Sequence, residues 1–305
     1  MNYFLKRLLV LPPLLILISL LAFLLVRTAP GGPFDKDRKP ASPEIERRLM
    51  ERYHLDQPLW KQYLIYLKGL AQGDLGPSLK QRNHSVNDII RQALPVSAVL
   101  GTASFMFALG VGIPLGFYTA AFRGRGFELA GSALAILFVC VPALVVGPVL
   151  VIVFAVHWQL FPVALWGGPW QMILPTMTLG LYFSGKVARL MREGMLTTMH
   201  ADYIVTARAK GLSESEVLWK HAFRIAVLPV VSYSGPLLAD LLTGSFVVES
   251  LFQIPGMGVF VINSALNRDY PMIVGLVLVY AVLLLVLNLL VDAAYTWLDP
   301  RVKYE

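Results

Sequence analysis

The chain has 305 residues, of which 56% are hydrophobic and only 15% are charged, and its formal net charge is +7. This composition is too apolar for an ordinary soluble domain and predicts a polytopic membrane protein. In a soluble protein the positive charge would suggest nucleic acid. In a membrane protein it fits basic residues that hold loops in the cytoplasm, so we expect no nucleic-acid partner. The single cysteine, Cys140, cannot form an intramolecular disulfide.

Six apolar stretches are long enough to cross a bilayer, which needs about 20 apolar residues per helix. They cover residues 8–26, 95–122, a third and a fourth stretch within 129–185, about 225–248, and 271–297. Proline and glycine residues between Trp158 and Trp170 predict the turn that separates the third stretch from the fourth. The first stretch is longer than a signal-peptide core and no small-residue cleavage site follows it, so we expect a retained helix.

The basic residues predict which side of the membrane each loop faces. Six spans place both termini on one side, and with the N-terminus inside, the short outer loops hold only Arg268. The cytoplasmic segments then hold Lys6, Arg7, Arg123, Arg125, Lys186, Arg189, Arg192, Arg208, Lys210, Lys220, Arg224, Arg301 and Lys303. By the positive-inside rule we expect cytoplasmic N- and C-termini. Residues 1–27 then form the N-terminal end and first span, and residues 28–94 form an extracytoplasmic loop with a helical pattern from about Ser42.

A polar segment, residues 202–224, separates two apolar stretches, and we call it the elbow. Its pattern predicts two short helices around a glycine. Asp202 is expected to cap the first helix, and Gly211 suits the left-handed position that ends it. Ser213 and Glu216 have capping-box spacing and can start the second helix. Such a helical elbow is suited to pressing on a partner, and the plainer alternative is a solvated connecting loop.

One acidic residue falls well inside a predicted span. Asp240 lies about two thirds along the fifth stretch, where an acid costs roughly 2.5–3.5 kcal/mol on insertion scales. The carboxyl group is therefore expected to face the interior of the bundle or a water-filled path. Two roles remain open for it: lining a translocation path, or making a structural hydrogen bond to a neighbouring helix.

The chain carries no recognisable catalytic or metal-binding motif. The five histidines show no metal-ligand spacing, and neither a nucleophile elbow nor a zinc-protease motif is present. An intramembrane enzyme would need such a constellation. We therefore expect that the chain is not an enzyme and binds no cofactor or metal.

Several segments resemble one family. TARAKGL at 206–212 and HAFRIAVLPVV at 221–231 resemble the EAA coupling loop of permease subunits in binding-protein-dependent ABC importers, in the form found in the peptide branch. The acidic residue that opens this motif in sugar permeases is Val205 here. Residues 74–98, 249–271 and 298–304 are also similar to the peptide permeases. The resemblance covers nearly the whole chain and is strongest to the B-type subunit of bacterial oligopeptide importers.

This resemblance implies an all-α fold, the six-transmembrane-helix type I ABC importer permease, with residues 95–305 as its core. It implies a pore-forming subunit that couples ATP hydrolysis on partner subunits to oligopeptide import through the bacterial inner membrane. The implied partners are a second, homologous C-type permease subunit, one or two kinds of cytoplasmic ATPase that hold ATP and magnesium, and an extracytoplasmic peptide-binding protein. The alternatives are a permease for dipeptides or a peptide-like solute such as glutathione, and a stand-alone secondary transporter.

The resemblance also assigns candidate site residues. The ATPase-coupling residues would be Asp202, Tyr203, Thr206, Ala207, Arg208, Ala209, Lys210, Gly211, Leu212, Ser213 and Glu216. The translocation path would include Asp240, Tyr233 and Ser234.

Overall fold

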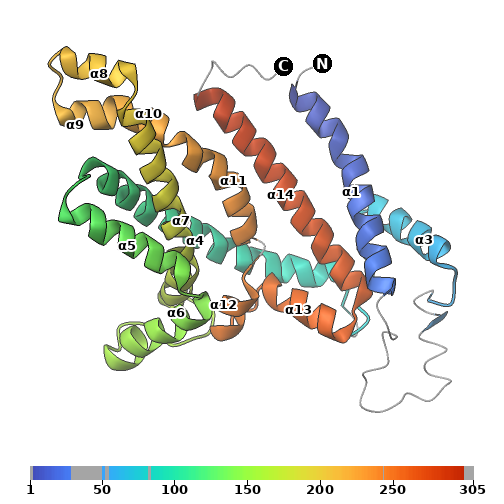
Figure 1. Cartoon of the computed structure of the whole chain (residues 1–305). Helices are drawn as coiled ribbons and strands as arrows, with labels where there is room; N and C mark the ends of the chain where they lie inside the picture. Colours follow the sequence, from blue (N-terminus) through green and yellow to red (C-terminus); the bar gives the residue numbers. More distant parts are fainter. Residues whose placement is uncertain (1–2, 29–49, 52–54, 82–83, 243, 299–305) are drawn as a thin grey trace.

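The computed structural model describes residues 3–28, 50–51, 55–81, 84–242 and 244–298, of which 3–8 and 291–298 by their backbone only. Its named elements are all helices, and the only β-pairing in the described residues is an isolated bridge between Pro77 and Ser85 (Figure 1). The predicted all-α fold is thereby confirmed. The expected helix start near Ser42 lies outside the described residues.

The helices follow the predicted apolar stretches in chain order. They are α1 (Tyr3–Thr28), α3 (Leu59–Ala71), α4 (Val86–Ala121), α5 (Gly126–Cys140), α6 (Ala143–Leu150), the π-helical η1 (Val151–His157), α7 (Pro169–Met199), α8 (Asp202–Ala209), α9 (Glu214–Glu216), the π-helical η2 (Val217–Ala222), α10 (Phe223–Ala226), α11 (Leu228–Leu242), α12 (Phe246–Leu251), α13 (Met257–Asn267) and α14 (Tyr270–Leu298).

The second predicted span is part of a longer helix. At 36 residues, α4 is about 54 Å long, well beyond the roughly 30 Å of a bilayer core. It begins at Val86 because Ser85 caps it: the Ser85 hydroxyl accepts from the backbone N–H of Asp88, and the Asp88 carboxylate accepts from the backbone N–H of Ser85. The first turns of α4 contain polar residues, so the apolar stretch predicted from the sequence began only at residue 95.

The third predicted span is broken, which corrects the expectation of one continuous helix. The helices on either side of the break, Gly126–Cys140 and Ala143–His157, meet at an angle of 106°. Pro142 lies at the break, and Val141 before it has an extended backbone (φ −86°, ψ 118°). Proline disfavours a helical conformation in the residue that precedes it, which explains the break. The turn predicted before Trp170 is present, since α7 starts at Pro169.

Among the described residues, four helices are long and apolar enough to span a membrane, or five if the bent pair counts as one span. The four are α1, α4, the segment Leu228–Leu251 and α14. The predicted fourth span is the 31-residue helix α7, which is less apolar. It is packed along α4, so much of its surface meets protein.

Close approach between α4 and α7 depends on small residues. A Cβ atom added at Gly116 would lie 2.2 Å from the carbonyl oxygen of Ala188, so only glycine fits there. Val187 and Met191, on the same side of α7, are completely buried in the central core. The glycines of this span therefore permit tight helix packing, as membrane helices commonly require.

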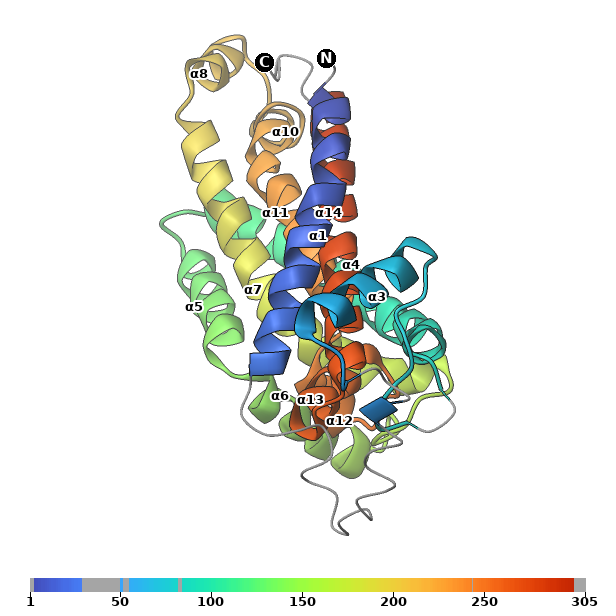
Figure 2. The same cartoon turned by 90° about the vertical axis from the view of Figure 1, so that its right-hand side faces the viewer.

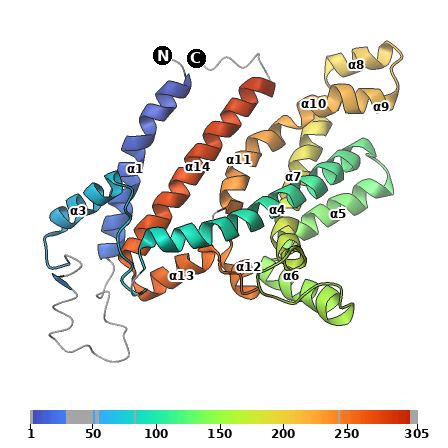
Figure 3. The ribbon, with the colours of Figure 1, turned by 180° about the vertical axis from the view of Figure 1, so that it is seen from behind.

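The bundle has two distinct ends. In Figures 1 and 2, α1 begins and α14 ends at the end that carries α8 and α9, whereas α6, α12 and α13 lie at the opposite end. Figure 3 shows α14 between α1 and α11, in agreement with their contacts. The elbow, the start of the first span and the end of the last span thus share one end, as the six-span topology predicts.

A buried carboxylate holds α12 and α13 against α4. Glu249, on α12, is completely buried and accepts a hydrogen bond from the hydroxyl of Ser97 at 2.7 Å. It also accepts from the backbone N–H of Val259 at 3.3 Å, and the backbone N–H of Met257 donates to the Ser97 hydroxyl at 2.8 Å. The N–H groups at the start of α13, which have no partner within that helix, are thereby satisfied by side-chain oxygens from α4 and α12. The apolar pattern alone did not reveal this contact.

Candidate coupling site and translocation path

The elbow folds as two helical segments around a glycine, as predicted. The first is α8, and the second runs through α9, η2 and α10 into α11. Gly211 stands between them with a φ of +79°, the left-handed region that glycine adopts without cost. An added Cβ at Gly211 would meet nothing within 4 Å. The requirement for glycine is therefore a matter of backbone conformation and not of space.

The two helix starts of the elbow differ from each other. The predicted cap at Asp202 is wrong: Ala201 is the N-cap residue, no side chain caps the helix, and Asp202 is its first residue. A carboxylate in the first turn still interacts favourably with the positive end of the helix dipole. The predicted cap at Ser213 is confirmed, because its hydroxyl oxygen accepts from the backbone N–H of Glu216 at 3.3 Å. Thr206 donates its hydroxyl proton to the carbonyl of Asp202 within α8.

A forked ion pair ties the two segments together. Arg208 on α8 donates from Nε to one carboxylate oxygen of Glu214 at 3.0 Å and from Nη2 to the other at 2.6 Å. The hydrogen bond from Arg208 holds the pKa of the Glu214 carboxyl below its usual range. Both side chains are partly exposed, so solvent screens the pair and its net contribution is small. It nevertheless links α8 directly to the start of the second segment.

One face of the elbow is packed into the chain's own core. Ile204 and Val217 are completely buried and Ala207 is 6% exposed. Ala207 was expected among the coupling residues, and the structure gives its side chain a packing position inside the elbow. Because both helical segments contribute to this face, the elbow is a compact unit and not a flexible loop.

The other face of the elbow is open. Its exposed apolar side chains include Tyr203, Val205 and Leu212, with Val205 57% exposed. Arg208, Ala209 and Lys210 are exposed beside them. Val205, which stands where sugar permeases carry the acidic residue that opens the motif, was not among the predicted coupling residues. The adjacent apolar pair Ile204 and Val205 is the sequence signal that could have found it, since neighbouring helical residues point in different directions and both cannot pack inward.

Aromatic rings connect the elbow to the bundle. The ring of Trp219, on η2, lies 4.3 Å from that of Phe117 near the end of α4, centroid to centroid. Phe223 lies 6.0 Å from the same ring. Phe117 is almost completely buried, at 1% exposure. The elbow is therefore in direct contact with α4, and the chain continues from it into α11.

The candidate path residues lie on α11. Tyr233 and Ser234 are half-buried, and Asp240 is exposed on the isolated chain. The Ser234 hydroxyl donates to the carbonyl of Val231 at 2.6 Å, so its hydrogen-bonding capacity is used within the helix. Tyr233 and Asp240 both interact electrostatically with Lys186 on α7.

Lys186 is a functional candidate that sequence reasoning missed. Its Nζ lies 4.4 Å from the ring centroid of Tyr182 and 5.6 Å from that of Phe183. The positive-inside pattern predicted this lysine to be a cytoplasmic charge. The signal that could have found it is the presence of Asp240 on another span, because an acid within the membrane calls for a partner of opposite charge.

Comparison with known proteins agrees with this architecture. Residues 112–304 match the family described as binding-protein-dependent transport system inner membrane component. The chain belongs to this family. It is therefore a transport permease and a multi-pass inner-membrane protein, with the type I permease fold. Family membership implies ATPase partners and a second permease subunit.

Relatives of this permease match it along its full length. It is 40% identical over 306 residues to the oligopeptide transport system permease protein OppB of Haemophilus influenzae, covering 100% of both chains. It is 41% identical over 303 residues to the dipeptide transport system permease protein DppB of Bacillus subtilis, covering 99% of this chain and 98% of the relative.

Solved structures support the fold. The permease resembles a chain of the MetNI methionine ABC transporter in an inward-facing conformation, with a TM-score of 0.57 at 15% identity. The match covers 69% of this chain and 96% of that one. At this identity the likeness concerns the architecture alone.

Proposed function

We propose that this permease is the pore-forming subunit of an ATP-driven importer of oligopeptides, and that the elbow couples ATP hydrolysis on partner subunits to transport. The observation that carries the coupling role is the elbow itself: a braced helical unit with an exposed apolar face at one end of the bundle. The substrate class rests on full-length similarity to permeases named for oligopeptides and dipeptides.

In this proposal the elbow docks on a cytoplasmic ATPase subunit. Tyr203, Val205 and Leu212 provide apolar contact area, and the exposed Lys210 adds a charge at its edge. ATP and magnesium are held by the ATPases, of one or two kinds. When the ATPases close, the elbow moves as a rigid body and carries α11 with it. The remaining partners are a homologous C-type permease subunit and an extracytoplasmic peptide-binding protein.

The orientation follows from charge. The elbow end of the bundle carries the basic residues that the positive-inside rule places in the cytoplasm, among them Arg192, Arg208 and Lys220. The start of α1 and the end of α14 lie at this same end. We therefore infer that both termini are cytoplasmic and that α12 and α13 lie on the extracytoplasmic side.

The translocation path runs along α7 and α11 in this proposal. Asp240, Tyr233 and Lys186 form a polar group on two neighbouring helices, and the acid is exposed on the isolated chain. Charged groups within a membrane protein face a water-filled path or a partner. The second permease subunit would cover this side, so that the path lies between the two permeases.

Reconstitution tests this function directly. The permease is co-purified with its partner subunits, placed in proteoliposomes, and given a labelled oligopeptide with its binding protein. We expect uptake that requires ATP and that unlabelled oligopeptides inhibit more strongly than dipeptides or glutathione. Robust uptake by the permease alone, without ATPase subunits, would instead establish a secondary transporter. Stronger inhibition by dipeptides or glutathione would reassign the substrate.

A further inference from the structure

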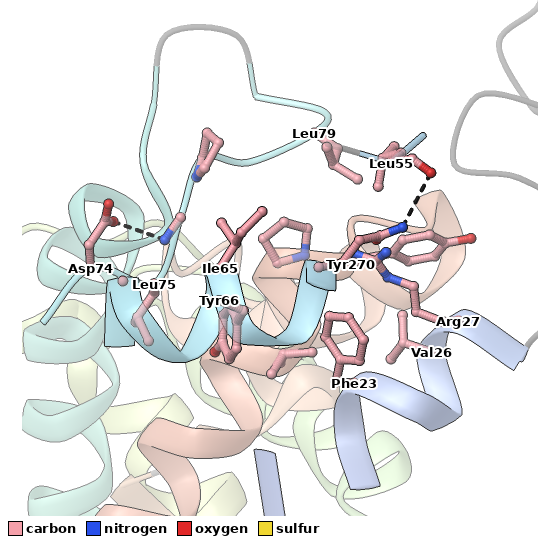
Figure 4. A pocket seen from close by; sticks show the side chains of 16 residues that line it. Phe23, Val26, Arg27, Leu55, Ile65, Tyr66, Asp74, Leu75, Leu79 and Tyr270 are labelled. Carbon is pink, nitrogen blue, oxygen red and sulfur yellow. Dashed lines mark hydrogen bonds between the residues drawn. The ribbon is translucent and has the colours of Figure 1, made fainter. Parts of the chain in front are cut away.

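A pocket opens where the last turns of α1, the helix α3 and the start of α14 meet (Figure 4). Its volume is about 320 Å3, and the rings of Phe23, Tyr66 and Tyr270 line it. Arg27 contributes from the end of α1, and Gln62 contributes from α3. Neither the elbow nor the α7–α11 group belongs to this pocket, so the function proposed above does not account for it.

Three polar atoms on the residues that line the pocket are buried and lack a hydrogen-bond partner within the described part of the chain. They are Nε of Arg27, Oε1 of Gln62 and the hydroxyl oxygen of Tyr66. Buried polar groups in proteins are bonded in roughly nine cases of ten. Three exceptions around a single cavity indicate that the cavity receives a polar molecule.

Arg27 supplies the positive charge of the pocket. Its Cζ lies 4.5 Å from the ring centroid of Phe23 and 5.5 Å from that of Tyr270, so cation–π contacts hold the guanidinium in place. No ion pair between Arg27 and a carboxylate occurs among the residues that the structure describes. Burial raises the pKa of the Tyr66 hydroxyl, which therefore stays protonated and can donate. Together these groups suit an anion.

The pocket also offers acceptors. Nε2 of Gln62 donates to the carbonyls of Leu55 at 3.2 Å and Gln57 at 2.6 Å. These two bonds fix the orientation of the amide and leave its oxygen as the unpaired acceptor. The Asp74 carboxylate lines the pocket away from Arg27 (Figure 4), and it accepts from the backbone N–H of Gly76. A matching ligand therefore carries an anionic group and, near it, an O–H or N–H donor.

The surroundings place this pocket at the level of lipid headgroups. Leu25, on the outer surface of α1, is 70% exposed, and Arg27 follows it where the apolar run ends. The amphipathic helix α3 exposes Trp60 and Leu64, at 66% and 54%, while Gln62 and Tyr66 line the pocket. An apolar helix face with tryptophan, lying beside the end of a span, is typical of the membrane interface.

We propose that this pocket binds the headgroup of a membrane phospholipid, with its phosphate on the Arg27 guanidinium and the Tyr66 hydroxyl. A donor of the headgroup, a glycerol hydroxyl or an ammonium N–H, bonds to the Gln62 carbonyl oxygen. The acyl chains lie along the exposed leucines of α1. The bound lipid thereby fastens α3 to α1 and α14.

Native mass spectrometry of the purified permease complex tests this binding by titration with three lipids. Phosphatidylglycerol and phosphatidylethanolamine carry headgroup donors, whereas phosphatidylcholine does not. We expect a single binding site, with an affinity for phosphatidylglycerol and for phosphatidylethanolamine about tenfold higher than for phosphatidylcholine. Loss of one hydrogen bond to a buried acceptor predicts a difference of this size. Equal binding of all three would overturn the proposal, because lipid around the bundle would account for it.

Two variants locate the site. Arg27→Met and Tyr66→Phe should each weaken binding of phosphatidylglycerol about tenfold. Arg91→Met, which removes an exposed arginine outside the pocket, is the matched control and should bind normally. Equal loss in all three variants, or none in the first two, would exclude this pocket as the site. If inorganic phosphate at a similar concentration displaced the lipid, the ligand of the pocket would be a free anion and the lipid proposal would be wrong.

Discussion

Gly211 carries the sharpest backbone requirement in the elbow. Its φ of +79° is strained for any side chain with a Cβ, and more so for a β-branched one. Gly211→Val should therefore distort the elbow and reduce ATP-dependent uptake severalfold, while the protein still inserts. Gly211→Asn is the matched control, because asparagine tolerates the left-handed region. Uptake is measured against membrane abundance, and normal uptake in the valine variant would contradict the coupling role.

The Arg208–Glu214 pair predicts how the elbow responds to acid. The folded-state pKa of Glu214 is lowered from 4.5 by Arg208, so the pair's stabilisation is present above that ordinary value and is lost as the pH falls through the lowered pKa. We expect hydrogen exchange of α8, corrected for its intrinsic pH dependence, to stay constant between about pH 6 and pH 8 and to rise in acid.

Two substitutions assign that response. Glu214→Gln should remove the rise of α8 hydrogen exchange in acid. Glu216→Gln disrupts the pair of Glu216 with Lys220 and should leave that rise largely in place. A response that survives Glu214→Gln would show that another group is responsible.

At the scale of the element, the elbow has an inward face and an outward face, and crosslinking distinguishes them. Ala209 is exposed and Ala207 is buried. In a background with Cys140→Ala, Ala209→Cys should form a crosslink to the ATPase subunit in the assembled transporter, and Ala207→Cys should not. The adduct is identified by its mass. Reaction of Ala209→Cys with the extracytoplasmic binding protein would reverse the proposed orientation.

The α12–α13 unit depends on its buried carboxylate. Glu249→Ala removes the acceptor of Ser97 and of the N–H of Val259, and leaving buried donors unsatisfied costs about 2 kcal/mol. We expect a lower melting temperature of the purified complex. Ser264→Ala is the control, because this buried hydroxyl donates only to a carbonyl of its own helix. An equal effect of the two substitutions would argue against the inter-helix role.

At the scale of the whole molecule, Asp240 tests whether the path runs along α7 and α11. If it lines the path, Asp240→Asn should change transport rate or substrate range at near-normal abundance. If it is a structural hydrogen-bonding group, the amide should be tolerated and Asp240→Leu should lower folding yield. The deciding variant is Asp240→Cys with Cys140→Ala. If the new thiol reacted only with lipid-soluble reagents and with no aqueous reagent in any transport state, Asp240 would not line the path.

The sequence by itself determined the all-α membrane fold, the permease family and the glycine elbow. Apolar runs report helices that meet lipid, because every backbone group there must be satisfied within its own helix. Gly211 and the cap at Ser213 were predictable for a related reason. Both depend on local backbone chemistry that neighbouring residues specify.

Only the tertiary structure decided which side chains meet. The 106° bend at Pro142, the inward position of Ala207 and the contact of Lys186 with the Asp240 helix depend on neighbours far away in the sequence. The same holds for Glu249, 152 residues from its partner Ser97, and for the pocket that joins α1, α3 and α14. Their physical basis is packing and buried hydrogen bonding between helices, which the periodicity of a single helix does not encode.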